Sequence, residues 1–314
     1  MRDSPTRTSL SPALVPAHGL ARSWSTPYGP KVSVGQASAL MHTEPFLSWP
    51  ELNDEAVAMA VGVGRRSRLM LCSSSGPRAL DALLEGDDFR SRFARALAAR
   101  RACDRKEFFE NFEFFERSRR VLRPIADRGA DRTLVDVGGG HGLLAALFAT
   151  FEAERFSRVL VADTTRPPAF DAVVDSLREV APWAADRLEY AEGAQADFLR
   201  GEGARLLPRG CAVACVHGCG SLTDSVIEAA AAADSRALAI MPCCYGGLAK
   251  RAPAALRSSL GVGLTADVER TYRLEAAGYR VKWRALPVAI TPLNRLILAR
   301  RDSTARPLDR DGMM

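Results

Sequence analysis

Three glycines, Gly138, Gly140 and Gly142, follow a short apolar run, and Asp136 lies two residues ahead of the first. Glycine lets the backbone turn sharply and approach a ligand without a clash at Cβ. The apolar stretch that begins at Leu143 predicts a helix, and a helix N-terminus favours polar or anionic groups. Strand, glycine loop and helix in this order predict a nucleotide-binding loop rather than a structural turn without a ligand.

The spacing of these glycines separates two kinds of cofactor. A dinucleotide loop has the pattern G-x-G-x-x-G, but the sixth position counted from Gly138 is Leu143. The third glycine comes one residue earlier, at Gly142, and the loop reads D-x-G-x-G-x-G from Asp136. This pattern resembles motif I of methyltransferases that depend on S-adenosylmethionine (SAM). The resemblance implies that Asp136 and Gly138 to Gly142 hold the methionine part of SAM.

Acidic residues also follow the next two predicted strands. Asp163 ends the run that begins at Val159, and a carboxylate there can accept hydrogen bonds from both hydroxyls of a ribose. A lone Asp at a strand end is also common as a helix cap or turn residue, but the glycine loop favours the ribose role. The resemblance implies a polar contact to adenine after the third strand, where Asp197 and Gln195 compete for the role.

Two polar motifs follow the fourth and fifth predicted strands. The first is H-x-C-G-x-x-T-D from His217 to Asp224, and the second is P-C-C-Y from Pro242 to Tyr245. The carboxyl ends of adjacent parallel strands share one edge of a sheet, where ligands bind. The two motifs resemble a methyltransferase domain found in several methyltransferase-like proteins and in the glutathione S-transferase C-terminal-domain-containing protein. They are similar, more distantly, to eukaryotic tRNA ribose 2′-O-methyltransferases.

This resemblance covers about residues 106–300 and implies RNA as the leading methyl acceptor. Tyr245 stands where the tRNA enzymes have a histidine, and their N-terminal Cys/His zinc-finger spacing is absent. Protein and small-molecule acceptors therefore stay open. A SAM-binding regulatory or scaffold protein without catalysis is a further alternative. A nicotinamide oxidoreductase is another, although the glycine spacing argues against it.

His217 is the candidate catalytic base. SAM carries an activated methyl group, so the protein mainly positions the nucleophile and removes its proton. A histidine, with an ordinary pKa of about 6.5, can take a proton from a hydroxyl, although a buried structural histidine is the alternative. Asp224 either orients His217 or caps the following helix. His141, inside the glycine loop, is expected to contribute its backbone rather than a catalytic side chain.

The cysteines lack the regular spacing of a secreted disulfide scaffold, which favours a reducing, intracellular and cytoplasmic setting. His217, Cys219, Cys243 and Cys244 are all residue types that bind zinc. Neighbouring cysteines rarely suit one tetrahedral site, however, and the spacing matches no common zinc finger. The sequence therefore predicts no metal here, and these cysteines are interpreted as small residues that pack beneath SAM.

Short apolar runs that alternate with helical segments predict a Rossmann-like α/β domain over residues 131–300. The first five runs are far enough apart for crossover helices, and the last two are close enough for an antiparallel hairpin. This is the seven-stranded sheet of a class I methyltransferase. The expected strands are Thr133–Val137, Arg158–Ala162, Arg187–Tyr190, Cys211–Val216, Ala237–Met241, Tyr279–Leu286 and Arg295–Ala299.

Residues 44–130 predict a helical N-terminal layer. In the segment from Lys106 to Arg123, Phe108, Phe112 and Phe115 share one helix face. This stripe is expected to be buried against the sheet rather than to stack on nucleic-acid bases. The charged residues that alternate along the same segment predict an ordinary solvated face: Lys106, Glu107, Glu110, Glu113, Glu116, Arg119 and Arg120.

The two ends of the chain read differently from the middle. Residues 1–43, rich in Ser, Thr, Pro and Arg, predict a disordered leader or an organellar transit peptide, and residues 301–314 a flexible tail. The formal net charge is +6, but four basic residues against Asp3 place +3 of it in residues 1–43, so the folded part is only weakly basic. No apolar run approaches the roughly 20 residues of a membrane span, so no membrane partner is predicted. The oligomeric state is not indicated.

Overall fold

The computed structural model describes residues 23–26, 29–33, 43–64, 70–71, 78–123, 132–245 and 253–301. Two short strands, β1 (Ser23–Thr26) and β2 (Gly29–Ser33), pair in antiparallel fashion within the segment expected to be a leader. The rest of residues 1–42 and the tail 302–314 lie outside the described residues. The predictions of a leader or transit peptide and of a flexible tail stay predictions.

Seven strands form one mixed sheet in the order β5-β4-β3-β6-β7-β9-β8. Strands β3 to β7 run parallel, and β9 is antiparallel to both β7 and β8. This confirms the Rossmann-like seven-stranded methyltransferase sheet, and every strand end lies within two residues of its predicted position. The strands are β3 (Thr133–Val137), β4 (Arg158–Asp163), β5 (Leu188–Glu192), β6 (Ala212–Cys215), β7 (Ala237–Ile240), β8 (Tyr279–Ala285) and β9 (Arg295–Arg301).

Helices precede the sheet and connect its strands. Several begin at acidic caps: the Asp88 and Asp104 side chains accept hydrogen bonds from backbone N–H groups in the first turns of α4 and α5. The helices are η1 (Pro50–Asn53), α2 (Glu55–Val61), α3 (Arg78–Leu83), α4 (Phe89–Arg100), α5 (Arg105–Leu122), α6 (Leu143–Phe151), α7 (Pro168–Val180), α8 (Pro182–Ala185), α9 (Ala194–Leu199), η3 (Gly203–Leu206), α10 (Leu222–Ala232) and α11 (Ala254–Ala276), which is kinked at Gly261.

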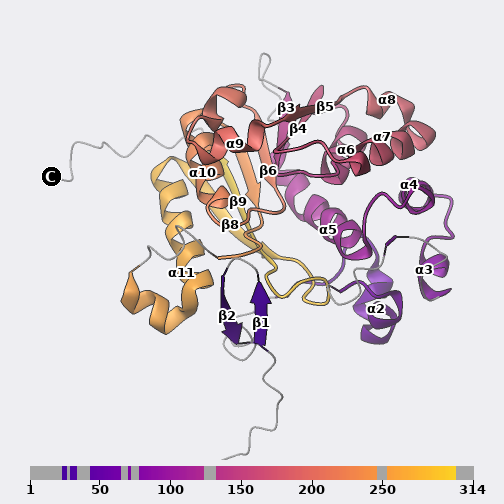
Figure 1. Ribbon diagram of the computed structural model, residues 1–314, viewed down its shortest axis with the longest axis horizontal. Coiled ribbons are helices and arrows are strands. Elements are labelled where there is room, and N and C mark those ends of the chain that lie inside the picture. The colour runs from indigo at the N-terminus through magenta and orange to yellow at the C-terminus, as the bar shows by residue number, and fades with distance from the viewer. Residues whose placement is uncertain are drawn as a thin grey trace, which may run out of the picture.

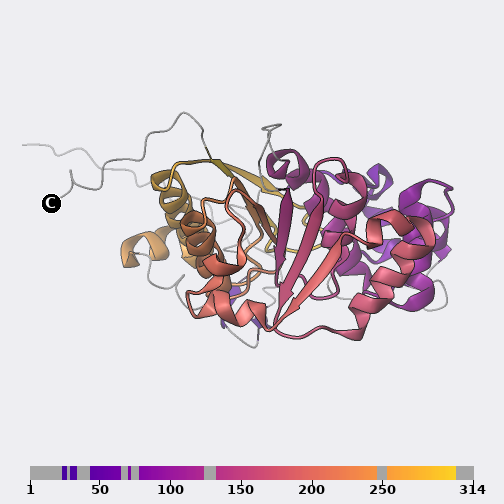
Figure 2. The same cartoon turned by 90° about the horizontal axis from the view of Figure 1, so that it is seen from above.

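The sheet is the middle of three layers (Figures 1 and 2). Helices α5, α6 and α7 cover one face, and α9, α10 and α11 cover the other. Successive residues of a strand point to opposite faces, so Leu134 of β3 packs in the first core and Val135 in the second. Because both faces are covered, the central strands are apolar along their whole length, and this is why the sequence marks them so clearly.

Helix α5 is buried on nearly all sides. Phe108, Phe112 and Phe115 are at most 1% exposed, as predicted for the aromatic stripe. The prediction of a solvated face on the same helix is wrong, since Glu110 and Glu113 are also buried. The physical reason differs for the two: the N-terminal segment covers Glu113 through Leu47 and Ser48, whereas Glu110 lies against His217 and Lys106. The Trp49 ring of the same segment packs against three phenylalanines of α5.

Two buried charged residues of α5, Glu113 and Arg117, form an ion pair. Glu113 pairs with Arg117 and accepts hydrogen bonds from the backbone N–H groups of Leu47 and Ser48. Arg117 also donates to the carbonyl oxygen of Ala285, at the end of β8. One charged pair therefore holds the N-terminal segment, α5 and the terminal hairpin together.

A second buried ion cluster joins α10 to α11. Arg270, which is fully buried, donates to both carboxylate oxygens of Asp224 at 2.9 and 3.1 Å and to Asp267 at 3.1 Å. Asp267 also accepts hydrogen bonds from Arg295 and from the Tyr245 hydroxyl.

Among the described residues, no helix is long and apolar enough to cross a membrane.

Replacing Arg270 by Met should lower the free energy of unfolding by about 3–5 kcal/mol, because two buried carboxylates lose their shared cation. The matched control is Arg178→Met, which removes an exposed pair with Asp175 and should cost less than about 1 kcal/mol. Urea denaturation of both variants tests this. Equal losses for the two would contradict a stabilising role for the buried cluster.

Candidate functional site

A pocket lies at the carboxyl ends of β3 and β6, the two central strands. The chain leaves β3 toward β4 and β5 on one side and returns to β6 on the other, so the loops after β3 and β6 diverge. Helix α5 contributes the remaining wall. The lining residues are Glu107 and Asn111 from α5, Asp136 and Gly138 to His141 from β3 and its loop, and Val216 and His217 after β6.

The glycine loop has the left-handed backbone that its sequence predicts. Gly138, Gly140 and Gly142 have φ of 69°, 52° and 73°, which other residues adopt only at a cost. Gly139 is required for a different reason, because a Cβ there would lie 2.5 Å from a carboxylate oxygen of Asp136. The sequence analysis did not identify Gly139 as a required glycine, because this position is variable in the D-x-G-x-G-x-G pattern and its backbone is not left-handed.

Asp136 lies at the floor of the pocket and is fully buried. Neither of its carboxylate oxygens has a hydrogen-bond partner of good geometry among the described residues. Burial, together with the nearby Asp163 carboxylate, raises the pKa of Asp136 to about 8, against the opposing effect of the Ala145 amide. A buried carboxyl group without a partner is unfavourable unless a cation or a donor reaches it.

Asp163 lies at the end of β4 and contacts the glycine loop directly. One carboxylate oxygen accepts a 2.7 Å hydrogen bond from the Gly140 N–H, and the other accepts one of 2.6 Å from the Thr164 N–H. Tyr190, which the sequence interpretation did not identify, places its hydroxyl 2.6 Å from the Thr165 carbonyl oxygen and 3.3 Å from that of Gly140. The loops after β3 and β4 are thus held together. Asp163 keeps lone pairs that could accept further bonds.

The two candidates for an adenine contact separate in space. Asp197, on α9, pairs with Arg200 and does not line the pocket. Gln195 lies closer to the loop, because its amide nitrogen is 3.0 Å from the position that a Cβ of Gly138 would occupy. Gln195 thus lies beside the glycine loop, whereas the Asp197 side chain turns to the cation one helical turn away; the adenine contact itself stays a prediction.

His217 follows β6 and lines the pocket. Its Nε2 lies 3.5 Å from a carboxylate oxygen of Glu110, which is buried on α5 and also pairs with Lys106. The loss of solvation lowers the pKa of His217 below its ordinary value, and the negative charge of Glu110 opposes this. A neutral imidazole beside a buried carboxylate suits a group that accepts a proton.

His141 has a similar carboxylate neighbour. Its Nε2 lies 3.3 Å from Glu107, and its Nδ1 accepts a hydrogen bond from the Leu143 N–H. The contact with His141 is the main reason that the pKa of Glu107 falls to about 2. The side chain of His141 thus holds the glycine loop to α5, beyond the backbone contribution expected from the sequence.

Sequence reasoning missed the contribution of α5 to the pocket. Glu107, Glu110 and Asn111 occupy positions i, i+3 and i+4, so they share one face of the helix. That spacing was the available signal. It was read as part of a solvated face, because the sequence does not reveal that two histidines from distant loops face these residues.

The structure places Asp224 in contact with α11 rather than with His217, and its predicted catalytic role stays a prediction. Its carboxylate is bound by Arg270 and Arg273 of α11. It does not cap α10 either, because the N-cap position is Ser221 and Asp224 lies inside the first turn.

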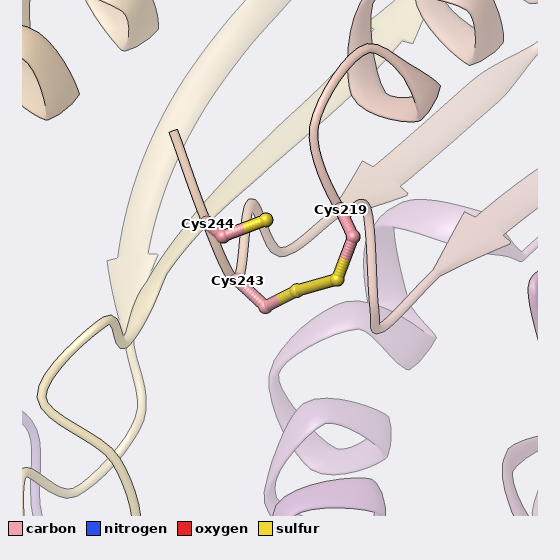
Figure 3. A group of neighbouring side chains, drawn as sticks. All are labelled: Cys219, Cys243 and Cys244. Atoms are coloured by element: carbon pink, nitrogen blue, oxygen red, sulfur yellow. A yellow bond between two sulfur atoms is a disulfide. The ribbon is translucent and has the colours of Figure 1, made fainter. Parts of the chain in front are cut away.

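Three cysteines of the two motifs lie close together at the ends of β6 and β7: Cys219, Cys243 and Cys244 (Figure 3).

Residues 110–251, from the middle of α5 to the segment beyond β7, match a protein family described as a methyltransferase domain. This segment therefore resembles a methyltransferase domain. SAM is its cofactor, as the D-x-G-x-G-x-G loop predicted. No curated protein matches the sequence.

Solved structures with similar folds share little sequence with this chain. The pre-rRNA processing protein fibrillarin of Methanococcus jannaschii is 13% identical with a TM-score of 0.36, over 55% of this chain and 66% of that one. A 16S rRNA adenine-N1-methyltransferase from Catenulisporales acidiphilia is 20% identical with a TM-score of 0.33, over 57% and 88%. An arsenic(III) SAM methyltransferase from Chlamydomonas reinhardtii is 13% identical with a TM-score of 0.36, over 58% and 67%. Scores this low carry no information about the acceptor.

The residues of the methyltransferase domain's pocket suit SAM on chemical grounds. The methionine part of SAM carries an ammonium group, and Asp136 is a buried carboxyl group without a hydrogen-bond partner of good geometry among the described residues. The backbone of the loop is accessible at Gly140, where a Cβ would have its nearest neighbour at 4.0 Å. A cation near Asp136 would favour the ionised carboxylate.

Without SAM, Asp136 should make the protein less stable as the pH rises. Its pKa of about 8 in the folded protein lies above the unfolded value of about 3.9, so between these values the unfolded state loses a proton that the folded state keeps. The free energy of unfolding should fall across this window by up to about 1.4 kcal/mol per pH unit relative to Asp136→Asn. Urea denaturation of both proteins at pH 5 and pH 7.5 measures the difference. A difference that does not change with pH would contradict the raised pKa.

Proposed function

We propose that the protein transfers the methyl group of SAM to an oxygen or nitrogen nucleophile, with His217 as the base. The observation that supports this most directly is the composition of one pocket, which combines the cofactor loop with His217 and the acidic face of α5. A methyltransferase needs only to bind SAM, orient the acceptor and remove its proton. The lining residues offer groups for each of these tasks.

For the cofactor, we assign roles residue by residue. Asp136 would pair with the ammonium group of the methionine part, and the backbone of Gly138 to Gly142 would enclose that part. Asp163 would accept hydrogen bonds from the ribose hydroxyls while it keeps its contact with Gly140. Gln195 is the better placed candidate for adenine, because Asp197 pairs with Arg200.

For the acceptor, His217 would take the proton that the nucleophile loses. SAM supplies a methyl group that its sulfonium already activates. Because Nε2 of His217 faces Glu110, Nδ1 would receive the proton, and the Glu110 carboxylate would stabilise the imidazolium that forms. Lys106 pairs with the same carboxylate, and its positive charge adds to the loss of solvation that lowers the pKa of His217.

We further propose RNA as the acceptor class. The support is the resemblance of H-x-C-G-x-x-T-D and P-C-C-Y to the motifs of tRNA ribose 2′-O-methyltransferases. A ribose hydroxyl is a nucleophile that needs a base, which agrees with a neutral histidine at the pocket. Protein and small-molecule acceptors, or SAM binding without catalysis, are the other outcomes of the experiment that follows.

Purified protein should transfer label from radiolabelled SAM into the RNA of a cell extract. Asp163→Ala should weaken SAM binding at least about tenfold, since charge-assisted hydrogen bonds contribute about 1.5–3 kcal/mol each. Asp175→Ala, which removes an exposed carboxylate from α7, is the matched control. Treatment of the products with nuclease or protease assigns the label.

Label that nuclease releases, and that Asp163→Ala abolishes, would support an RNA methyltransferase. Label in protein or small molecules would overturn the RNA acceptor but keep the reaction. No transfer to any acceptor in the extract, despite SAM binding, would favour a regulatory protein. A chain that does not bind SAM at all would refute the proposal and revive the nicotinamide alternative.

His217→Ala should lower kcat by about 10²–10⁴ and leave the Kd for SAM nearly unchanged. Glu110→Gln should move the acidic limb of the kcat–pH profile to lower pH, because the Glu110 charge raises the pKa of His217. The control is Glu116→Gln on the same helix, whose half-buried side chain pairs with Arg119. An acidic limb that stays in place with Glu110→Gln would sink the coupling between the two groups.

A further inference from the structure

Three sulfur atoms come together at the carboxyl ends of β6 and β7, from Cys219, Cys243 and Cys244. All three Sγ atoms lie within 4.8 Å of one another (Figure 3). Cys219 belongs to the loop after β6, and the two neighbouring cysteines belong to the loop after β7. Residues separated by 24 positions in the sequence thus form one cluster of potential metal ligands.

The backbone around the cluster is held by hydrogen bonds between the two loops. The Met241 N–H donates to the Cys215 carbonyl oxygen at 2.9 Å, and the Gly218 N–H donates to that of Met241 at 3.2 Å. These bonds extend the parallel pairing of β6 and β7 into the loops. The approach of the cysteines therefore depends on the sheet and not only on their own contacts.

The cluster is accessible, unlike the other described cysteines. Cys219 is exposed and Cys243 and Cys244 are partly exposed, whereas Cys103, Cys211 and Cys215 are buried. Burial raises the pKa of Cys103 and of Cys215, which disfavours their thiolates. A metal ion could reach the three clustered sulfurs and no other described thiol.

Cys244 also accepts a hydrogen bond. The Gly220 N–H donates to its Sγ at 3.1 Å. A backbone donor aimed at a sulfur stabilises a thiolate, and such outer contacts are typical around sulfur ligands of metals. The contact links the two loops a second time, now through a sulfur.

We propose that Cys219, Cys243 and Cys244 form a thiolate site for a divalent cation of the zinc type. Thiolates are soft ligands that select zinc over calcium or magnesium. Three protein ligands leave the fourth tetrahedral position to water or another ligand. His217, two residues from Cys219, does not belong to the cluster, because its Nε2 faces Glu110. This site was not predicted from the sequence, where the adjacent cysteines argued against a metal.

The redox state of the cysteines decides whether the site can form. Cys219 and Cys243 are joined as a disulfide in the structure, with Cα atoms 5.5 Å apart, and Cys244 is free (Figure 3). A thiol reductant would supply two electrons and two protons to this disulfide and become a disulfide itself. Zinc would then displace the three thiol protons and bind the three thiolates. Oxidation and metal binding compete for the same sulfurs.

The test is a metal titration of the full chain under reducing, anaerobic conditions. Zinc is added in competition with a chromophoric chelator, and Co²⁺ is used as a spectroscopic probe of thiolate ligands and tetrahedral geometry. The proposal expects one equivalent of metal per chain and a thiolate-to-cobalt charge-transfer band. Cys219→Ser, Cys243→Ser and Cys244→Ser should each lose this binding, and the control Cys103→Ala should retain it.

Several outcomes would overturn the proposal. One is the absence of zinc binding when a thiol assay shows that the three cysteines are reduced. Another is unchanged binding in Cys244→Ser, which would reduce the cluster to a disulfide pair. Circular dichroism of each variant separates loss of the site from loss of the fold. Methyl transfer is not the readout, so the result is independent of the function proposed above.

Discussion

The direction in which the chain crosses the sheet constrains everything at the pocket. β3 pairs with β4 on one side and with β6 on the other, so the loops that follow β3 and β6 diverge and leave their carboxyl ends open. The two loops are still close where they begin, since a Cβ at Gly138 would lie 3.9 Å from the His217 carbonyl oxygen. Helix α5 closes the third side. Residues from three separate parts of the chain become neighbours because of this topology, and no local sequence feature could bring them together.

The buried carboxyl group of Asp136 gives the pocket its electrostatic character. Water would stabilise the ionised form, but the fold excludes water from this group and offers no hydrogen-bond partner of good geometry among the described residues. The unfavourable free energy of burying this carboxyl group is offset by the packing of a core that continues across the sheet from the N-terminal segment to β9. Proteins commonly violate a packing rule at functional sites, where a ligand supplies the missing interaction. In the proposed role of Asp136, the same carboxyl group would link cofactor binding to the stability of the fold.

The sequence predicted the sheet well and the pocket only in part. Strands such as β3 are buried on both faces, so their apolar runs are unambiguous. The glycine loop was also clear, because left-handed backbone restricts the residue type at Gly138, Gly140 and Gly142. Helix α5 was misjudged in its charged positions. A glutamate that faces solvent and one that faces a histidine of a distant loop look identical in a sequence, and the partners of Glu107 and Glu110 are 34 and 107 residues away.

The two motifs that suggested a methyltransferase divide into residues that hold the loops and residues that lie at the pocket or in the cysteine cluster. The last residue of each motif, Asp224 and Tyr245, contacts the buried cluster on α11, through Arg270 and Asp267 respectively. Arg270 and Asp267 also pair with each other, so one ion network anchors both loops. The other polar residues precede these anchors in each motif: His217 lines the pocket, and the three cysteines gather at the ends of β6 and β7. The spacing from His217 to Asp224 places the start of α10 against α11 and leaves His217 at the pocket, where the described residues show no contact between His217 and Asp224.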